Sequence, residues 1–314
     1  MTTTAAAPRT ERPVLQAGDR VFARLAQGAG ILILAVLAGV AVFLVAEALP
    51  AIVAPASALP DGKGLVASIG PLVFGTVLSA LIALVVATPL AVGVALFITH
   101  YAPKRLAQTL GYLVDLLAAV PSIVYGLWGA AVLGPATVGL ATWLNRWFGW
   151  LPFFAGPVSA TGRTMFVAGL VLAVMILPII TAVSREVFRQ TPKLHEEAAL
   201  ALGATRWEMI RMAVLPFGRS GIISGAMLGL GRALGETMAV AIVLSVSGAV
   251  TVNLIGSSNP STIAANIALQ FPESTGIEVS TLIASGLVLF LITLAVNSVA
   301  RFIINRRREF SGAN

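Results

Sequence analysis

Two residues of opposite charge, Arg232 and Glu236, stand inside a long apolar and glycine-rich segment of the chain. If a helix begins near Gly221, Arg232 lies roughly 16 Å along it, at about 1.5 Å per residue. That depth is close to the centre of a bilayer, where a charge costs at least about 3 kcal/mol. Residues four apart share a helix face, so the two can form an ion pair that only fixes helix packing. Alternatively, the planar arginine fork binds two oxygens of an anion such as phosphate.

Glycines surround this charged pair at regular spacing. Gly221, Gly225 and Gly229 are four residues apart, and so are Gly231 and Gly235. Small residues at this spacing allow helices to approach closely in a membrane. The pattern therefore predicts close packing of this helix against neighbours.

A second apolar segment carries further candidates for a polar pathway. Pro121 predicts a break in its helix, and a broken helix exposes backbone groups, which is tolerated where a cavity is lined. Ser122 and Tyr125 are then candidate pore-lining donors. Asp115 precedes the break and either belongs to the pathway, faces water or pairs with a basic residue. His100 and His195 are predicted to be solvated loop residues.

Composition indicates a membrane protein. The 314 residues are 58% hydrophobic and 11% charged, whereas soluble domains carry about 25% charged residues. The absence of cysteine excludes disulfides, thiolate metal sites and a cysteine nucleophile. A bilayer core takes roughly 20 apolar residues per helix, so the chain has room for about six spans. The apolar runs cover about residues 25–53, 73–99, 110–132, 166–182, 222–246 and 280–303.

We therefore predict an all-α polytopic membrane protein with about six transmembrane helices. Its expected parts are an N-terminal tail (1–24), a transmembrane domain (25–305) and a C-terminal tail (306–314). The first apolar run is longer than the core of a signal peptide, which favours an uncleaved anchor. Pro89 and Pro178 are expected to kink or break their spans. The aromatic-rich stretch 134–160 suits a loop or short helix at the membrane interface.

The basic residues give the orientation. Most lysines and arginines fall in the N-terminal tail, around residues 104–105, in the connection 184–219 and near the C-terminus. Only Lys63, Arg146 and Arg163 fall on the other side. Cytoplasmic loops carry the excess of Lys and Arg, so both termini are expected in the cytoplasm. The net charge of +7 is thus a topology signal, and no nucleic acid is expected as a partner.

The connection of about 184–220 has a helical pattern of its own. Pro192 suits a helix start, and Gly203 suits a left-handed residue that ends the helix. A second short helix is expected to stop at Leu215-Pro216. Such a projecting helix–Gly–helix unit can dock in a groove of a soluble partner, although a plain surface loop explains the same residues. The residues of interest are Glu196, Glu197, Ala198, Ala199, Gly203, Leu215 and Pro216.

This loop resembles the EAA loop of bacterial ABC importer permeases. Glu197-Ala198-Ala199, Gly203 and Leu215-Pro216 match that motif, and Ala213 departs from its usual Ile. The runs 229–240 and 115–129 resemble PstC-type permeases of phosphate-specific ABC transporters, although that family often has Glu where this chain has Asp115. The resemblance extends over about residues 25–310.

The resemblance implies the ABC importer type I permease fold in the bacterial cytoplasmic membrane and a role for Arg232 and Glu236 in phosphate passage. It also implies that the EAA loop is the coupling helix to the ATPase. The implied partners are a PstA-type sister permease, a PstB-type ATPase dimer, a PstS-type phosphate-binding protein and membrane lipid. No cofactor is expected on this chain, because ATP and Mg would be used by the ATPase.

The chain lacks the G-x-x-x-x-G-K-[ST] phosphate loop, so it is not expected to be an enzyme by itself. Near neutral pH phosphate still carries a proton, which it can donate in a hydrogen bond to Glu236. Sulfate carries no such proton, so Glu236 is a candidate selectivity residue.

Three alternative functions stay open. They are an importer of another oxyanion such as molybdate or sulfate, a secondary transporter driven by an ion gradient, and a structural assembly subunit.

Overall fold

A computed structural model describes residues 17–248 and 250–308, and their regular structure is helical apart from one isolated bridge between Val246 and Asn259. The prediction of an all-α protein is confirmed. Short 3-10 and π-helical segments connect several of the α-helices. The α-helices are α1 (Ala17–Val53), α2 (Leu65–Leu96), α3 (Lys104–Ala118), α4 (Ser122–Trp128), α5 (Gly134–Phe148), α6 (Met165–Arg189), α7 (Lys193–Ala201), α8 (Arg206–Met209), α9 (Leu215–Leu234), α10 (Met238–Val243), α11 (Ile263–Gln270) and α12 (Ile277–Arg308).

Within the described residues, 6 helical segments are long and apolar enough to cross a membrane. This agrees with the number of spans expected from the apolar runs. A helix satisfies its own backbone hydrogen bonds, which a lipid-exposed backbone requires. The segments are Gly18–Val53, Leu65–Tyr101, Ser122–Phe148, Met165–Arg189, Arg206–Leu234 and Ile277–Phe302.

The chain divides into two compact units, residues 1–47 and 48–314. In the first unit, the described part is the α1 helix from Ala17, whose large apolar side chains such as Ile31, Leu34 and Val42 are exposed. An apolar helix of this kind suits lipid as its surroundings. The helix starts inside the predicted tail 1–24, of which residues 1–16 lie outside the described part. The tail 306–314 is described only as far as Arg308.

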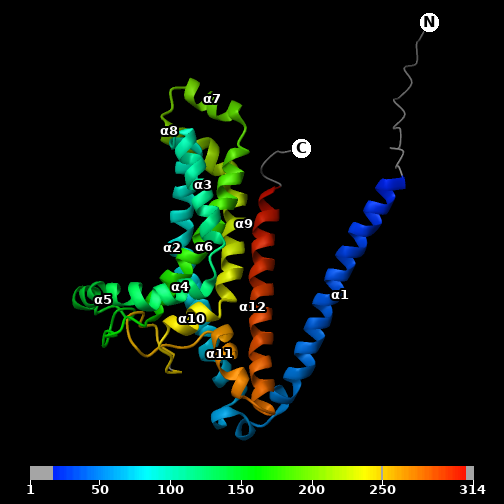
Figure 1. Cartoon of the computed structure of the whole chain (residues 1–314), viewed down its shortest axis with the longest axis vertical. Helices are drawn as coiled ribbons and strands as arrows, with labels where there is room; N and C mark the ends of the chain where they lie inside the picture. Colours follow the sequence, from blue (N-terminus) through cyan, green and yellow to red (C-terminus); the bar gives the residue numbers. More distant parts are fainter. Residues whose placement is uncertain (1–16, 249, 309–314) are drawn as a thin grey trace. The chain divides into compact units, whose positions relative to one another are not determined.

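In the second unit, the core lies where α2, α6 and α9 pack together (Figure 1). Small residues permit this approach. A Cβ added at Gly221 would collide with Val187 of α6, and one at Gly225 would lie 3.2 Å from Val183. On α2, buried alanines at 80, 83, 87 and 91 join the same core. The predicted close packing of Gly221, Gly225 and Gly229 is therefore confirmed.

The helix ending predicted at Leu215-Pro216 is wrong, because α8 continues into α9 through a π-helical segment, Ile210–Val214. The wide π turn lets the Leu215 N–H reach the Ile210 carbonyl, which accommodates the proline ring without ending the helix. Two further π segments, Phe97–Tyr101 and Gly129–Leu133, also end two residues before a proline.

Prolines within the other spans have different outcomes. Pro121 separates α3 from α4, which confirms the predicted break. Pro89 and Pro178 lie inside α2 and α6, and both helices continue through them. The aromatic stretch after residue 134 begins with the helix α5, which extends sideways from the bundle of α2, α6 and α9 (Figure 1).

Candidate functional site

The fifth predicted run, 222–246, is not one continuous helix. Helix α9 ends at Leu234, residues 235–237 are not helical, and the short helix α10 starts at Met238. Arg232 therefore lies in the last turn of α9, and Glu236 lies in the break. Apolar residues stand on both sides of residues 235–237, so the average hydropathy of the run gave no sign of the interruption.

Glu236 is buried, with 8% of its surface exposed, and it stabilises the start of α10. Its Oε1 accepts a hydrogen bond from the backbone N–H of Ala239 at 3.0 Å. The first N–H groups of a helix have no partner within the helix, so a side-chain acceptor there is favourable. The Arg232–Glu236 ion pair, one of the two interpretations that the sequence left open, does not form, because neither ion pair found in the described residues includes Arg232 or Glu236. Because α9 ends at Leu234, the two side chains do not share a helical face.

Arg232 is partly exposed, and its side chain makes no hydrogen bond or ion pair with another residue in the described part of the chain. Its surroundings are open. A Cβ at Gly231 would meet nothing within 4 Å, and one at Gly235 would meet only the Gly231 carbonyl at 3.7 Å. The expected helix packing at Gly231 and Gly235 is therefore wrong within this chain. An unpaired guanidinium in such a place offers its full set of donors to an anion.

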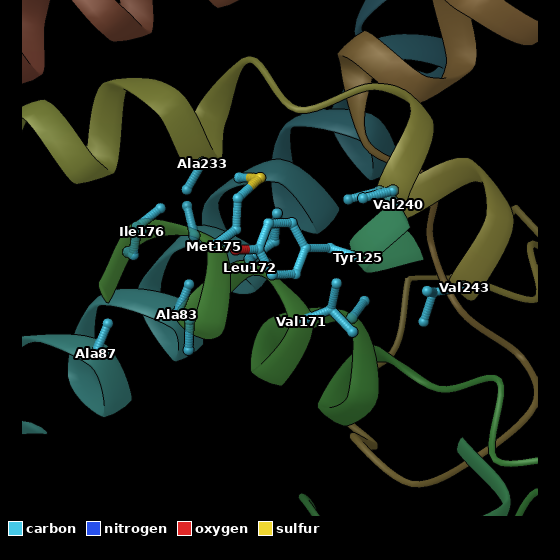
Figure 2. Packing of buried hydrophobic residues seen from close by; sticks show 14 of the residues in the cluster. Ala83, Ala87, Tyr125, Val171, Leu172, Met175, Ile176, Ala233, Val240 and Val243 are labelled. Atoms are coloured by element: carbon cyan, nitrogen blue, oxygen red, sulfur yellow. The ribbon is translucent and has the colours of Figure 1, made fainter. Parts of the chain in front are cut away.

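Tyr125 belongs to the same buried cluster as Ala233 and Leu234, the last two residues of α9. The residue is 6% exposed, and its ring lies beside Met175 and Leu172 of α6 (Figure 2). Its hydroxyl donates to the Leu117 carbonyl at 2.7 Å. In an unbroken helix that carbonyl would accept the N–H of residue 121, which is proline and has none. The Tyr125 hydroxyl, which the sequence made a candidate pore-lining donor, thus stabilises the break between α3 and α4.

The neighbouring candidates lie on both sides of the same break. Ser122 is the first residue of α4 and is partly exposed. Asp115, near the end of α3, has an exposed side chain that pairs with Arg185 of α6. The Arg185 Nη2 lies 3.2 Å from Oδ1 and 3.4 Å from Oδ2 of Asp115. Pairing with a basic residue was one of the three roles considered for Asp115. A place on a transport pathway for Ser122, Tyr125 and Asp115 stays a prediction.

The loop that contains Glu197 forms the helix–Gly–helix unit that the sequence predicts. Helix α7 follows Pro192, and Gly203 takes a φ of +86°, in the left-handed region that favours glycine. Thr205 then starts α8 with a reciprocal capping box to Glu208. Helix α7 has no buried residue and lies at the opposite end of the bundle from α11 (Figure 1). An exposed and well-capped knob of this kind suits docking to another protein.

One contact to this knob was not predicted. His100, with its side chain 10% exposed, lies 3.7 Å from Glu196 of α7, and its Nδ1 lies 2.7 Å from the Thr99 hydroxyl. The prediction that His100 is solvated is wrong, whereas His195 is exposed as expected. The two residues are far apart in the sequence, so no local spacing of residue types indicates this contact.

Asn259 is a second residue that the sequence did not single out. It is fully buried, and its amide donates to the carbonyls of Arg163, Ser245 and Gly256 while its oxygen accepts the Met165 N–H. These bonds fix the irregular segment after α10 to the start of α6. The irregular segment that follows α10 is thus anchored by one buried side chain.

Comparison with known proteins defines the class of this membrane protein. Residues 87–309 match the family described as "Binding-protein-dependent transport system inner membrane component". A solved bacterial ABC transporter involved in the import of the polysaccharide alginate has a similar fold, with a TM-score of 0.55 at 17% identity. That alignment covers 91% of this chain and 99% of the other.

Individual relatives narrow the class further. Phosphate transport system permease protein PstC 2 of Mycobacterium tuberculosis is 48% identical over 298 residues, which is 91% of each chain. The PstC protein of Mycobacterium leprae is 52% identical over 78% of this chain and 77% of its own. That of Mesorhizobium japonicum is 37% identical over 94% of this chain and 92% of its own. The chain therefore belongs to the binding-protein-dependent ABC importer permeases, and within them to the PstC-type permeases.

Proposed function

We propose that this chain forms one half of the membrane pathway of an ATP-driven importer of inorganic phosphate. The names of its PstC relatives support phosphate as the substrate. The observation that carries the proposal is the unpaired Arg232 beside the helix break at residues 235–237. A charge in a membrane-spanning segment is costly unless it meets a counter-ion, and a passing anion supplies one.

Arg232 would hold phosphate through two parallel N–H···O bonds, which its planar fork provides. Glu236 would then distinguish phosphate from sulfate. Its Oε1 is occupied by the Ala239 N–H, whereas its Oε2 accepts no hydrogen bond in the described chain. That oxygen can accept the proton that phosphate carries near neutral pH. Sulfate has no such proton and would be repelled by the buried carboxylate.

The energy of ATP hydrolysis would reach this chain through α7 and Gly203. The exposed loop would dock on a separate PstB-type ATPase dimer that binds ATP and Mg, while this chain has no catalytic role. A PstA-type sister permease would supply the other half of the pathway, and a PstS-type binding protein would deliver phosphate from outside. Both termini would lie in the cytoplasm, which places the basic loop on the same side as the ATPase.

The proposal is tested by uptake of labelled phosphate into proteoliposomes that contain the complete complex with ATP inside. We expect uptake that requires internal ATP, persists with ionophores present and is not reduced by excess sulfate or molybdate. Uptake that stops with an ionophore would favour a secondary transporter. Preferential uptake of sulfate or molybdate would replace phosphate as the substrate. An absence of uptake of any of these oxyanions in an intact complex would favour a purely structural subunit.

A further inference from the structure

A second cluster of cations lies away from Arg232, between α3 and the end of α6 from which the coupling loop starts. It borders a cavity of about 540 Å³. A water molecule occupies about 30 Å³ in the liquid, so the cavity has room for a small hydrated anion. The charged residues around it are Lys104, Asp115, Arg185 and Arg189.

The charges around this cavity do not balance. Lys104, Arg185 and Arg189 contribute three positive charges, and Asp115 contributes the one negative charge. Among the described ion pairs, Asp115 pairs only with Arg185, at 3.2 Å. Lys104 and Arg189 are therefore left without an acidic partner in the described chain. A cavity lined by an excess of one sign concentrates ions of the other sign.

Arg185 is held in place but only partly satisfied. Its side chain is 15% exposed, and both of its hydrogen bonds leave from Nη2. Its Nε is buried and has no hydrogen-bond partner. Gly111 of α3 makes room for the guanidinium, since a Cβ there would lie 2.6 Å from Nη1. The Nε is costly to leave buried without an acceptor, whereas Nη1, which also donates no hydrogen bond in the described chain, keeps its N–H groups for a further acceptor.

We propose that this cavity binds a phosphate group, at a site separate from Arg232. Arg185 and Arg189 would contact its oxygens, and Lys104 would add a point charge. A phosphate group offers at least three acceptor oxygens, which suits several donors arriving from different directions. The same chemistry is supplied by free inorganic phosphate or by the headgroup of an anionic phospholipid.

The absence of cysteine from this chain allows a direct test. Gln108→Cys places one thiol in the cavity wall, and Thr109→Cys places one on the exposed next residue outside it. The complete complex is held in phosphatidylcholine nanodiscs, and the rate of alkylation of this chain by neutral N-ethylmaleimide is measured. Inorganic phosphate is compared with chloride at equal ionic strength, and discs containing phosphatidylglycerol form the lipid arm.

We expect severalfold slower alkylation of Gln108→Cys, but not of Thr109→Cys, in one of the two arms. Slowing by inorganic phosphate identifies the free anion, and slowing by phosphatidylglycerol identifies a headgroup. Lys104→Gln combined with Arg189→Gln should abolish the protection, and both of these side chains are exposed, which favours an intact fold. Arg105→Gln, next to the cavity but outside its lining, should leave the protection unchanged.

Equal alkylation rates in phosphate, chloride and phosphatidylglycerol would overturn the proposal. So would protection that persists in the Lys104→Gln/Arg189→Gln variant. Arg232→Gln should retain the protection, because that residue lies outside the cavity. Loss of uptake in Arg232→Gln with intact protection at Gln108→Cys would thus separate the two sites, and either can fail without the other.

Discussion

The Oε1 of Glu236 accepts a hydrogen bond from the backbone N–H of Ala239, 3.0 Å away, and makes no ion pair with Arg232. The acid therefore caps α10, and the arginine keeps its charge for another partner. This division of roles depends on the end of α9 at Leu234. A continuous helix would have placed the two side chains on one face.

Two substitutions separate the capping role of Glu236 from its proposed role in selectivity. Glu236→Gln keeps an oxygen that can accept the Ala239 N–H, so we expect normal assembly. The loss of the buried negative charge should allow sulfate to compete for uptake of labelled phosphate. Glu236→Ala removes the acceptor and should lower stability by about 1 kcal/mol, the usual cost of a lost cap. Phosphate uptake by Glu236→Gln with unchanged discrimination against sulfate would refute the selectivity role.

Tyr125→Phe tests whether the hydroxyl serves the break or the pathway. We expect a loss of about 1 kcal/mol in stability, because the Leu117 carbonyl loses the hydroxyl donor and keeps only backbone N–H donors such as that of Val120, at 3.3 Å. Phosphate uptake at matched protein levels should be retained. Thermal unfolding of the complex measures the first effect, and Tyr112→Phe, at an exposed position, is the control. Unchanged stability together with lost uptake would assign the hydroxyl to the pathway.

Gly221→Leu tests the close contact between α9 and α6. A larger side chain must displace Val187, and overpacking of this kind costs roughly 1–3 kcal/mol. We expect a lower unfolding temperature and a reduced yield of assembled complex. Gly231→Ala, where a Cβ meets nothing within 4 Å, should fold as wild type. Equal loss of stability in both variants would show that the contact with α6 is not the cause.

Gly203→Ala tests the proposed coupling role of the loop after α7 by straining its backbone. The left-handed conformation costs a residue with a Cβ roughly 1–2 kcal/mol, while the space around Gly203 is open. The strained loop should lose part of its fit to the ATPase, so ATP hydrolysis stimulated by phosphate and its binding protein should fall. Gly93→Ala, in a helix with open space around it, is the matched control. Normal stimulation in the Gly203 variant would show that the loop shape is not needed for coupling.

Features with a local cause could be predicted from the sequence. Apolar length gives the membrane-spanning helices, Pro121 gives the break after α3, and Gly203 gives the left-handed turn. Each depends on the residue itself or on a short window of neighbours. The exposed helix α7 follows in the same way from its composition and its caps.

Features that depend on distant contacts could not be predicted. Asp115 and Arg185 are separated by 70 positions, and the sequence does not indicate which basic residue the acid meets. Glu236 accepts a hydrogen bond at the start of the next helix, α10, and the spacing of Arg232 and Glu236 does not show that α9 ends at Leu234, between them. The continuation of the helix through Pro216 depends on a π turn, which no residue type predicts. For these reasons the alternative of an Arg232–Glu236 ion pair and the helix end predicted at Leu215-Pro216 were both wrong.

The proposed function depends on the binding of the transported anion by the unpaired guanidinium of Arg232. Labelled phosphate uptake with internal ATP should be compared in wild type, Arg232→Gln and the exposed control Arg219→Gln, at matched amounts of assembled complex. We predict uptake in wild type and in the control, and a loss of at least about tenfold in Arg232→Gln, as expected when a charge-assisted contact of about 1.5–3 kcal/mol is removed. Equal uptake by all three would contradict the claim and leave Arg232 without a role in phosphate passage.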